Sequence, residues 1–152
     1  NSCYWPSFTV PVRTMLDMRI GELTMHVWDI RYTIDGYYHL SGDNVNVLID
    51  TVGRAVRRAF RPDDSVDGQI RYRFEMKTPI TATADIVVAA QGTHVEPASA
   101  VAADVTFRCD GETYVLVMYG RLSPEDAIAQ GRLTFQGDSE LAGSFGRRFK
   151  GG

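Results

Sequence analysis

The chain has 152 residues, of which 44% are apolar and 23% are charged, a balance that excludes a largely disordered or fibrous protein. Its net charge of −3 argues against a nucleic-acid-binding surface, and no apolar run approaches the roughly 20 residues of a membrane-spanning helix. Cys3 and Cys109 are too few for a disulfide framework. We therefore expect a globular protein from a reducing, cytoplasmic setting.

The first third of the sequence predicts an irregular segment over 1–11 and then two long helices. A helix is expected over 12–34, because its apolar residues recur every three or four positions. This stripe consists of Leu16, Ile20, Leu23, Val27, Ile30 and Ile34. A second helix is expected over 43–60, with several arginines near its end, where the helix dipole favours positive charge. These arginines suit either a solvated helix end or a binding patch.

After the polar linker 61–68 the apolar period changes from that of a helix to that of a strand. Strands are expected over 70–77, 83–90, 103–108 and 132–136, and helices over 113–119, from Ser123 onward, and over 139–149. Two helices followed by mixed strands and helices indicate two domains, 1–64 and 65–152. The expected fold class is α+β.

The first predicted helix carries a pair of side chains suited to metal binding. Glu22 and His26 are four residues apart, which places both on one face of a helix, about one turn from each other. A carboxylate and an imidazole in this arrangement can bind a divalent transition metal. Asp29 lies on the same side and could orient His26. A catalytic zinc usually has three protein ligands, so this pair alone is incomplete.

The segment 18–30, MRIGELTMHVWDI, resembles the ligand-bearing helix of the DinB-like, mycothiol-dependent maleylpyruvate isomerases. The pattern R-x-x-E-x-x-x-H-x-W-D of that family is matched by Arg19, Glu22, His26, Trp28 and Asp29. The resemblance implies that Glu22 and His26 bind a divalent metal, usually zinc. It also implies mycothiol or a similar small thiol as cofactor.

In that family a third ligand, a histidine, comes from an earlier helix of a four-helix bundle. The sequence begins with Asn1 rather than Met, and it has no helix early enough to supply this histidine. We therefore expect 1–64 to be a partial DinB-like bundle. Upstream helices, from the same protein or from another chain, would complete the metal site.

The C-terminal third resembles a sterol carrier protein type-2 domain. The resemblance rests on the segments ADVTF (103–107), YGRLSPEDA (119–127), QGRLTFQGD (130–138) and LA (141–142). It implies an α+β domain with an apolar tunnel between sheet and helices. Candidate tunnel residues are Leu116, Met118, Phe135, Leu141 and Phe145, which a plain core would equally contain.

Two functions follow from these resemblances. The first is a metal- and thiol-dependent isomerase or S-transferase that acts on a small electrophilic, carboxylated substrate. In the isomerase family an arginine of the C-terminal domain points toward the active cleft. Arg121 is the first candidate to hold the substrate carboxylate, and Arg108, the second, is assigned to cofactor binding. Asp29 would assist catalysis by orienting His26. The alternative is a non-catalytic carrier of lipids or other hydrophobic ligands.

Overall fold

The computed structural model describes residues 2–5 and 8–149. The chain forms two compact units, Asn1–Thr51 and Val52–Gly152. The division falls within the second long helix, N-terminal to the domain boundary expected near residue 65. None of the described helices is both long and apolar enough to cross a membrane.

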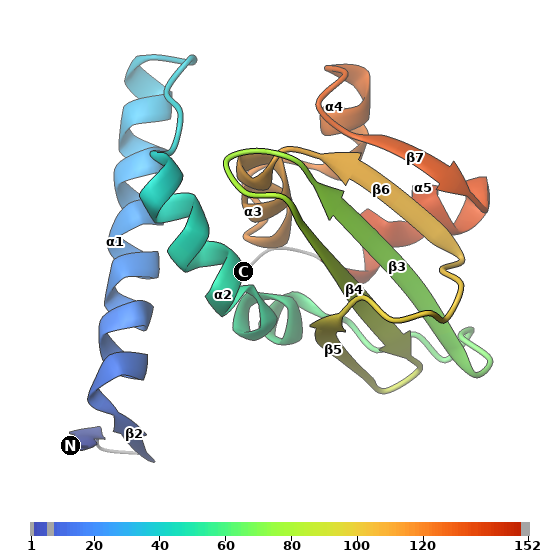
Figure 1. Cartoon of the computed structure of the whole chain (residues 1–152), viewed down its shortest axis with the longest axis horizontal. Helices are drawn as coiled ribbons and strands as arrows, with labels where there is room; N and C mark the ends of the chain where they lie inside the picture. Colours follow the sequence, from blue (N-terminus) through green and yellow to red (C-terminus); the bar gives the residue numbers. More distant parts are fainter. Residues whose placement is uncertain (1, 6–7, 150–152) are drawn as a thin grey trace. The chain divides into compact units, whose positions relative to one another are not determined.

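The first unit contains a short hairpin and the two predicted helices. β1 (Ser2–Trp5) and β2 (Phe8–Pro11) pair antiparallel, so the prediction of an irregular start was wrong for these residues. α1 (Val12–Ile34) matches its predicted span, and α2 (Gly42–Ala59) begins and ends within one residue of its own. The loop between them reverses the chain, and Figure 1 shows α1 as one uninterrupted helix.

The apolar stripe of α1 lies in solvent. Leu23 is 57% exposed, Ile30 63% and Ile34 81%, whereas the buried face consists of Gly21, Thr24, Met25 and Trp28. The expectation that the stripe faces a core of the described chain was therefore wrong. α1 carries apolar side chains on two faces, and such a helix is normally covered on both sides.

An exposed apolar stripe of this length favours self-association. We predict that the 152-residue chain associates reversibly, and that Leu23→Glu combined with Val27→Glu shifts it toward the monomer in sedimentation velocity. Thr33→Glu adds a charge to the same helix outside the stripe and should leave the association unchanged. A wild-type chain that remains monomeric at high concentration would contradict this prediction.

The second unit is built on a five-stranded sheet. Its strands are β3 (Gln69–Met76), β4 (Ala82–Ala89), β5 (Gly92–Pro97), β6 (Val105–Cys109) and β7 (Thr134–Gly137), in the order β5-β4-β3-β6-β7. Only β3 and β6 pair in parallel. Four of the strands were predicted, and β5 was missed because the apolar-polar alternation of Gly92–Pro97 is weak.

Three helices complete this unit: α3 (Gly111–Met118), α4 (Pro124–Ala129) and α5 (Ser139–Arg148). Each starts at a side chain that accepts hydrogen bonds from the free N–H groups of the first turn, namely Asp110, Ser123 and Asp138. α3 contacts β3, and α5 contacts β6 and β7. Figure 1 shows α3 and α5 on the same side of the sheet.

Aromatic side chains fill the space between the sheet and these helices. Tyr72 and Phe74 alternate along β3 with polar residues and point to the helix side, where both are fully buried. Phe107 joins them from β6 and Phe145 from α5. The ring centroid of Phe145 lies between 4.9 and 5.5 Å from those of the other three. This aromatic layer is the core of the second unit.

Candidate ligand pocket

A pocket of about 440 Å³ opens in the second unit beside α5. Two segments line it: the turn that follows α2, and the first turns of α5 with its capping residue. The lining residues are Arg61, Pro62, Asp63, Ser65, Asp138, Glu140, Leu141, Ser144, Arg147 and Arg148. The wall is mainly polar and contains three arginines and three carboxylates.

Arg148 is the most deeply placed charge of this pocket, with 8% of its surface exposed. Its Nη1 donates hydrogen bonds to the Tyr72 hydroxyl, at 3.0 Å, and to the Ser144 hydroxyl. Its Nε lies 3.1 Å from a carboxylate oxygen of Asp63, but no aligned hydrogen bond joins them. The guanidinium is thus fixed by one end and keeps hydrogen-bonding capacity at the other.

Asp63 stays ionised beside this arginine. Hydrogen bonds from Ser65, and then the positive charge of Arg148, hold the pKa of the Asp63 carboxyl below its ordinary value. Burial has the opposite effect on Tyr72 and raises the pKa of its hydroxyl, although Arg148 partly opposes the shift. The pocket floor is therefore a neutral phenol next to an ion pair at neutral pH.

The five candidate tunnel residues fall in three different environments. Leu116, Met118 and Phe145 are fully buried in the core, Leu141 lines the pocket, and Phe135 is 39% exposed. Tyr72 connects the pocket to the core, because its hydroxyl contacts Arg148 while its ring lies 4.9 Å from that of Phe145. A polar opening thus lies directly against the aromatic layer.

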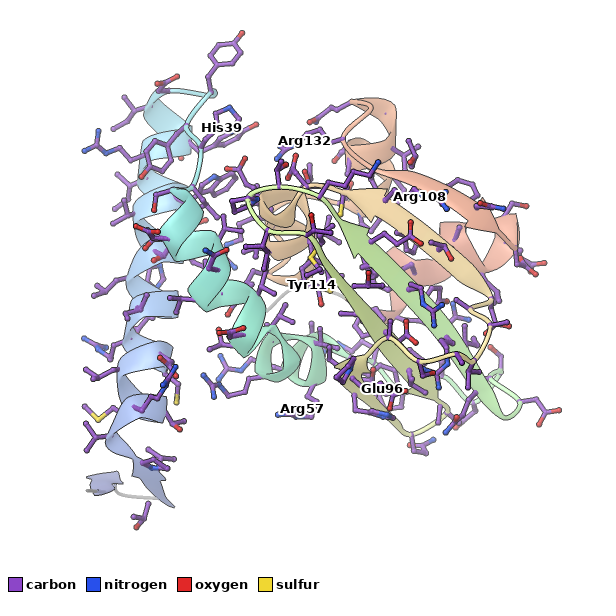
Figure 2. All side chains as sticks on the ribbon, in the orientation of Figure 1. His39, Arg57, Glu96, Arg108, Tyr114 and Arg132 are labelled. Carbon is purple, nitrogen blue, oxygen red and sulfur yellow. The ribbon has the colours of Figure 1, made fainter. Side chains whose placement is uncertain are left out.

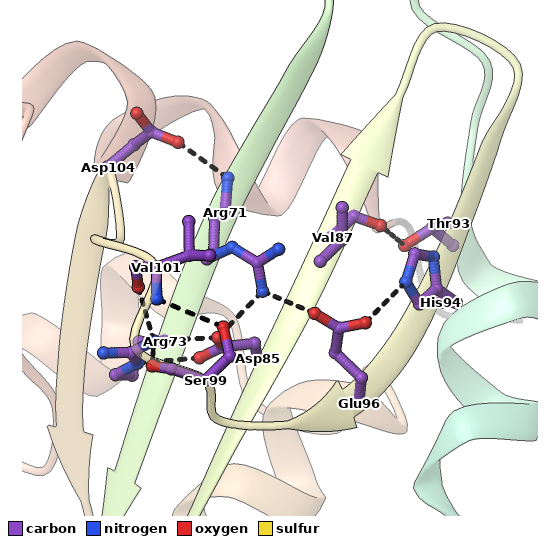
Figure 3. Close-up of polar contacts among 10 residues, drawn as sticks. All are labelled: Arg71, Arg73, Asp85, Val87, Thr93, His94, Glu96, Ser99, Val101 and Asp104. Carbon is purple, nitrogen blue, oxygen red and sulfur yellow. Dashed lines mark hydrogen bonds and ion pairs between the residues drawn. The ribbon is translucent and has the colours of Figure 1, made fainter.

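The opposite face of the sheet carries a separate charge network, drawn in Figure 3. The fully buried carboxylate of Asp85 accepts two hydrogen bonds from Arg73, at 2.8 and 2.9 Å, and one from Arg71 at 2.9 Å. Glu96 binds the same Nη1 of Arg71 at 2.6 Å and lies 3.1 Å from His94 Nε2. Because its charged groups pair with one another, we interpret this network as structural.

Arginine pairing controls the ionisation of Asp85. Burial alone would raise the pKa of its carboxyl, but the hydrogen bonds from Arg73 and Arg71 outweigh that effect and lower it. Asp85 is therefore a carboxylate at neutral pH, although no part of its side chain is exposed. A group in this state stabilises a structure and is poorly placed to exchange a proton.

The predicted metal ligands of α1 lie side by side in solvent. Glu22 and His26 keep 51% and 64% of their side chains exposed, and Glu22 accepts a hydrogen bond from Arg19 at 2.8 Å. His26 Nδ1 lies 3.8 Å from an oxygen of Asp29, the residue expected to orient it. Within residues 2–5 and 8–149, no group of three His, Cys, Asp or Glu residues forms a metal site.

The two predicted arginines are engaged in local contacts of the second unit. Arg121 lies in the turn after α3, half-buried, and donates to the carbonyl of Tyr119 at 2.8 Å. Arg108 lies exposed on β6, where it pairs with Glu75 at 2.8 Å and contacts Gln136 (Figure 2). They do not share a site with each other.

Cys109 follows the same pattern of local, structural placement. Burial, and then the nearby negative charge of Asp110, raise the pKa of the Cys109 thiol to about 12. Such a thiol is protonated at neutral pH and is a poor nucleophile. This agrees with the sequence interpretation of Cys109 as a structural residue.

Sequence reasoning missed the residues of the pocket. Arg148 follows Phe145 by three positions and Ser144 by four, so the spacing alone places all three on one face of α5. The assignment of Phe145 to the inward face could therefore have extended to a buried arginine. No comparable signal marks Asp63, because it reaches Arg148 from a turn that is distant in sequence.

Comparison with known proteins identifies the class to which this α+β fold belongs. The SCP-2 sterol transfer family matches residues 64–150, and the chain belongs to this family. The match covers the region in which the sequence resembled a sterol carrier type-2 domain. It lends no support to the DinB-like, isomerase-type resemblance of α1. No curated protein matches the chain.

Solved structures agree on the fold. The inverting sec-alkylsulfatase Pisa1 from Pseudomonas sp. superposes with a TM-score of 0.52 and 17% identity, over 64% of this chain and 15% of the sulfatase chain. Sterol Carrier Protein 2 Like 2 from Aedes aegypti gives a TM-score of 0.44 and 20% identity, over 68% of this chain and 94% of that one. The chain thus corresponds to a small part of the sulfatase.

Proposed function

We propose that the second unit binds and carries a hydrophobic ligand. Membership of the SCP-2 sterol transfer family supports this function. The observation that carries it here is the position of the α5 pocket, whose floor residue Tyr72 is also part of the aromatic layer. A ligand that entered beside α5 could exchange water for aromatic contacts by displacing only a few side chains.

Binding of a hydrophobic ligand can be tested directly. Nile red, lauric acid and cholesterol are titrated into the 152-residue chain, and saturable binding of at least one of them, at about one molecule per chain, is expected. Leu141→Trp places an indole at the pocket wall and should weaken binding about tenfold, by filling the space of the ligand.

The matched control adds the same ring elsewhere on α5. Gly143 faces open space, so Gly143→Trp should leave ligand binding unchanged. If no probe binds in a saturable manner, or if both tryptophan variants behave like the wild type, the α5 pocket is not the entrance of a carrier site.

We propose, as a second function, that α1 is a metal-binding helix of a larger helical bundle. The observation in its favour is that Glu22, His26 and Asp29 project together beside an apolar stripe that the described chain leaves exposed. The donors present fall short of a complete zinc site, because a catalytic zinc uses three protein ligands. A further helix covering the stripe would have to supply the third ligand.

Metal affinity tests this second function separately from catalysis. We expect the chain to bind Zn²⁺ weakly in isothermal titration, and Glu22→Ala or His26→Ala to abolish the binding because each removes one of two donors. His39→Ala, which removes a histidine outside α1, is the matched control. Unchanged zinc binding in both α1 variants would refute the metal-binding role. An activity assay with mycothiol and maleylpyruvate becomes informative only once the missing ligand is supplied.

A further inference from the structure

We infer that Arg148 binds the carboxylate of an amphipathic ligand in the α5 pocket, and that this ligand displaces the carboxylate of Asp63. The inference rests on the proposed carrier function and specifies its ligand class as long-chain monocarboxylates. The argument depends on the hydrogen-bonding capacity of Arg148, on the charge balance of the pocket and on the position of the aromatic layer.

Arg148 has hydrogen-bond donors to spare although it is almost completely buried. A guanidinium has five N–H groups. Within the part of the chain that the structure describes, hydrogen bonds leave only from Nη1, to Tyr72 and Ser144. Nε is buried without an aligned partner. A buried donor without a hydrogen bond is costly, so an arginine in this state favours an additional acceptor.

Asp63 acts as a substitute for that acceptor. Its oxygen is close enough to Nε for an ion pair, at 3.1 Å, but poorly directed for a hydrogen bond. Its other oxygen is engaged by the backbone N–H and the hydroxyl of Ser65. Asp63 is half-buried in a turn rather than enclosed in the core. A free carboxylate could approach Arg148 with better alignment, because a planar guanidinium binds a carboxylate best through two parallel hydrogen bonds.

The charge balance of the pocket favours a monoanion. Three arginines face three carboxylates, so the formal charge of the lining is zero. Asp138 is used to cap α5, and Arg61 donates to carbonyl oxygens at the end of α2. A phosphate, with its higher charge, would meet unneutralised repulsion from Glu140 and Asp63, whereas a single carboxylate replaces the charge of Asp63 one for one.

The surroundings of Arg148 favour an apolar tail behind this carboxylate. Tyr72 joins the two environments, with its hydroxyl on Arg148 and its ring against Phe145. Leu141 and Pro62 contribute apolar surface at the rim. A carboxylate at Arg148 would therefore direct an attached alkyl chain toward the aromatic layer.

The experiment compares laurate with dodecanol, which has the same alkyl chain but no carboxylate. Their dissociation constants are measured by displacement of Nile red from the 152-residue chain. Asp63→Asn removes the competing charge and should tighten laurate binding about tenfold, with dodecanol unchanged. Asp64→Asn, at the exposed neighbouring position, is the matched control and should change neither. Arg148→Gln should weaken laurate at least about tenfold while dodecanol binding reports whether the fold is intact.

Each outcome decides a different point. Equal responses of laurate and dodecanol to Asp63→Asn would overturn the role of Arg148 and leave the carrier function standing. A wild-type chain that binds neither ligand would refute the carrier function and this inference together. Tighter laurate binding in Asp63→Asn alone supports the inference even if Arg148→Gln does not fold.

Discussion

Phe145→Ala is expected to lower the free energy of unfolding of the second unit by about 3–5 kcal/mol, the range for removing a large buried aromatic side chain. Phe145 is 1% exposed, and its ring lies against those of Tyr72, Phe74, Phe107 and Phe149. The substitution opens a cavity where α5 meets the sheet, and the neighbouring rings are held on several sides. Urea unfolding followed by tyrosine fluorescence or circular dichroism measures the loss.

Phe135→Ala is the matched control for this experiment. Phe135 lies on β7, is 39% exposed, and contacts the same core only through an edge contact with Phe107, at 6.4 Å. Its removal should cost about 1 kcal/mol, because little apolar surface is newly exposed. Comparable losses in the two variants would mean that the aromatic layer is not the cooperative core of the unit.

Asp85→Asn is expected to destabilise the second unit by at least about 2 kcal/mol, although the side chain barely changes in size. The carboxylate is fully buried between Arg71 and Arg73, whose side chains are 15% and 19% exposed. An amide cannot neutralise two guanidinium groups, and one of its two oxygens is replaced by a donor. Glu75→Gln removes a carboxylate from the exposed pair with Arg108 and should cost only about 0–1 kcal/mol.

The contribution of Asp85 should disappear in acid. The pKa of its carboxyl is lowered in the folded protein, so its stabilisation is complete above the unfolded pKa of about 3.9 and is lost as the pH falls through the folded value. The difference in unfolding free energy between wild type and Asp85→Asn should therefore be constant from pH 8 to about pH 5 and shrink below about pH 4. A difference that grows in acid would contradict the pairing.

Local sequence patterns were sufficient to predict most of the second unit. The alternation along β3 predicted both the strand and its buried face, and the capping residue Ser123 before a proline predicted the start of α4. These features depend on neighbouring residues and on propensities that act within a few positions. The same patterns supported the α+β fold class and the sterol carrier resemblance.

Partners distant in sequence were beyond this kind of reasoning. Asp85 reads as an isolated charge in an apolar strand, and its neutralisation by Arg71 and Arg73 depends on the register of β3 and β4. The stripe of α1 was correctly placed on one helix face, but periodicity does not reveal whether anything covers that face. The pocket at Arg148 likewise depends on a turn that meets the end of the chain.

The parallel pairing of β3 with β6 also affects how quickly the second unit can fold. The antiparallel strands β3, β4 and β5 are consecutive in the chain and can pair through short loops. Tyr72 and Arg148, by contrast, are 76 residues apart, and β6 can join β3 only after the intervening hairpin has formed. Since closing long loops slows folding, we expect the pocket to form late in folding, after the meander that supports it.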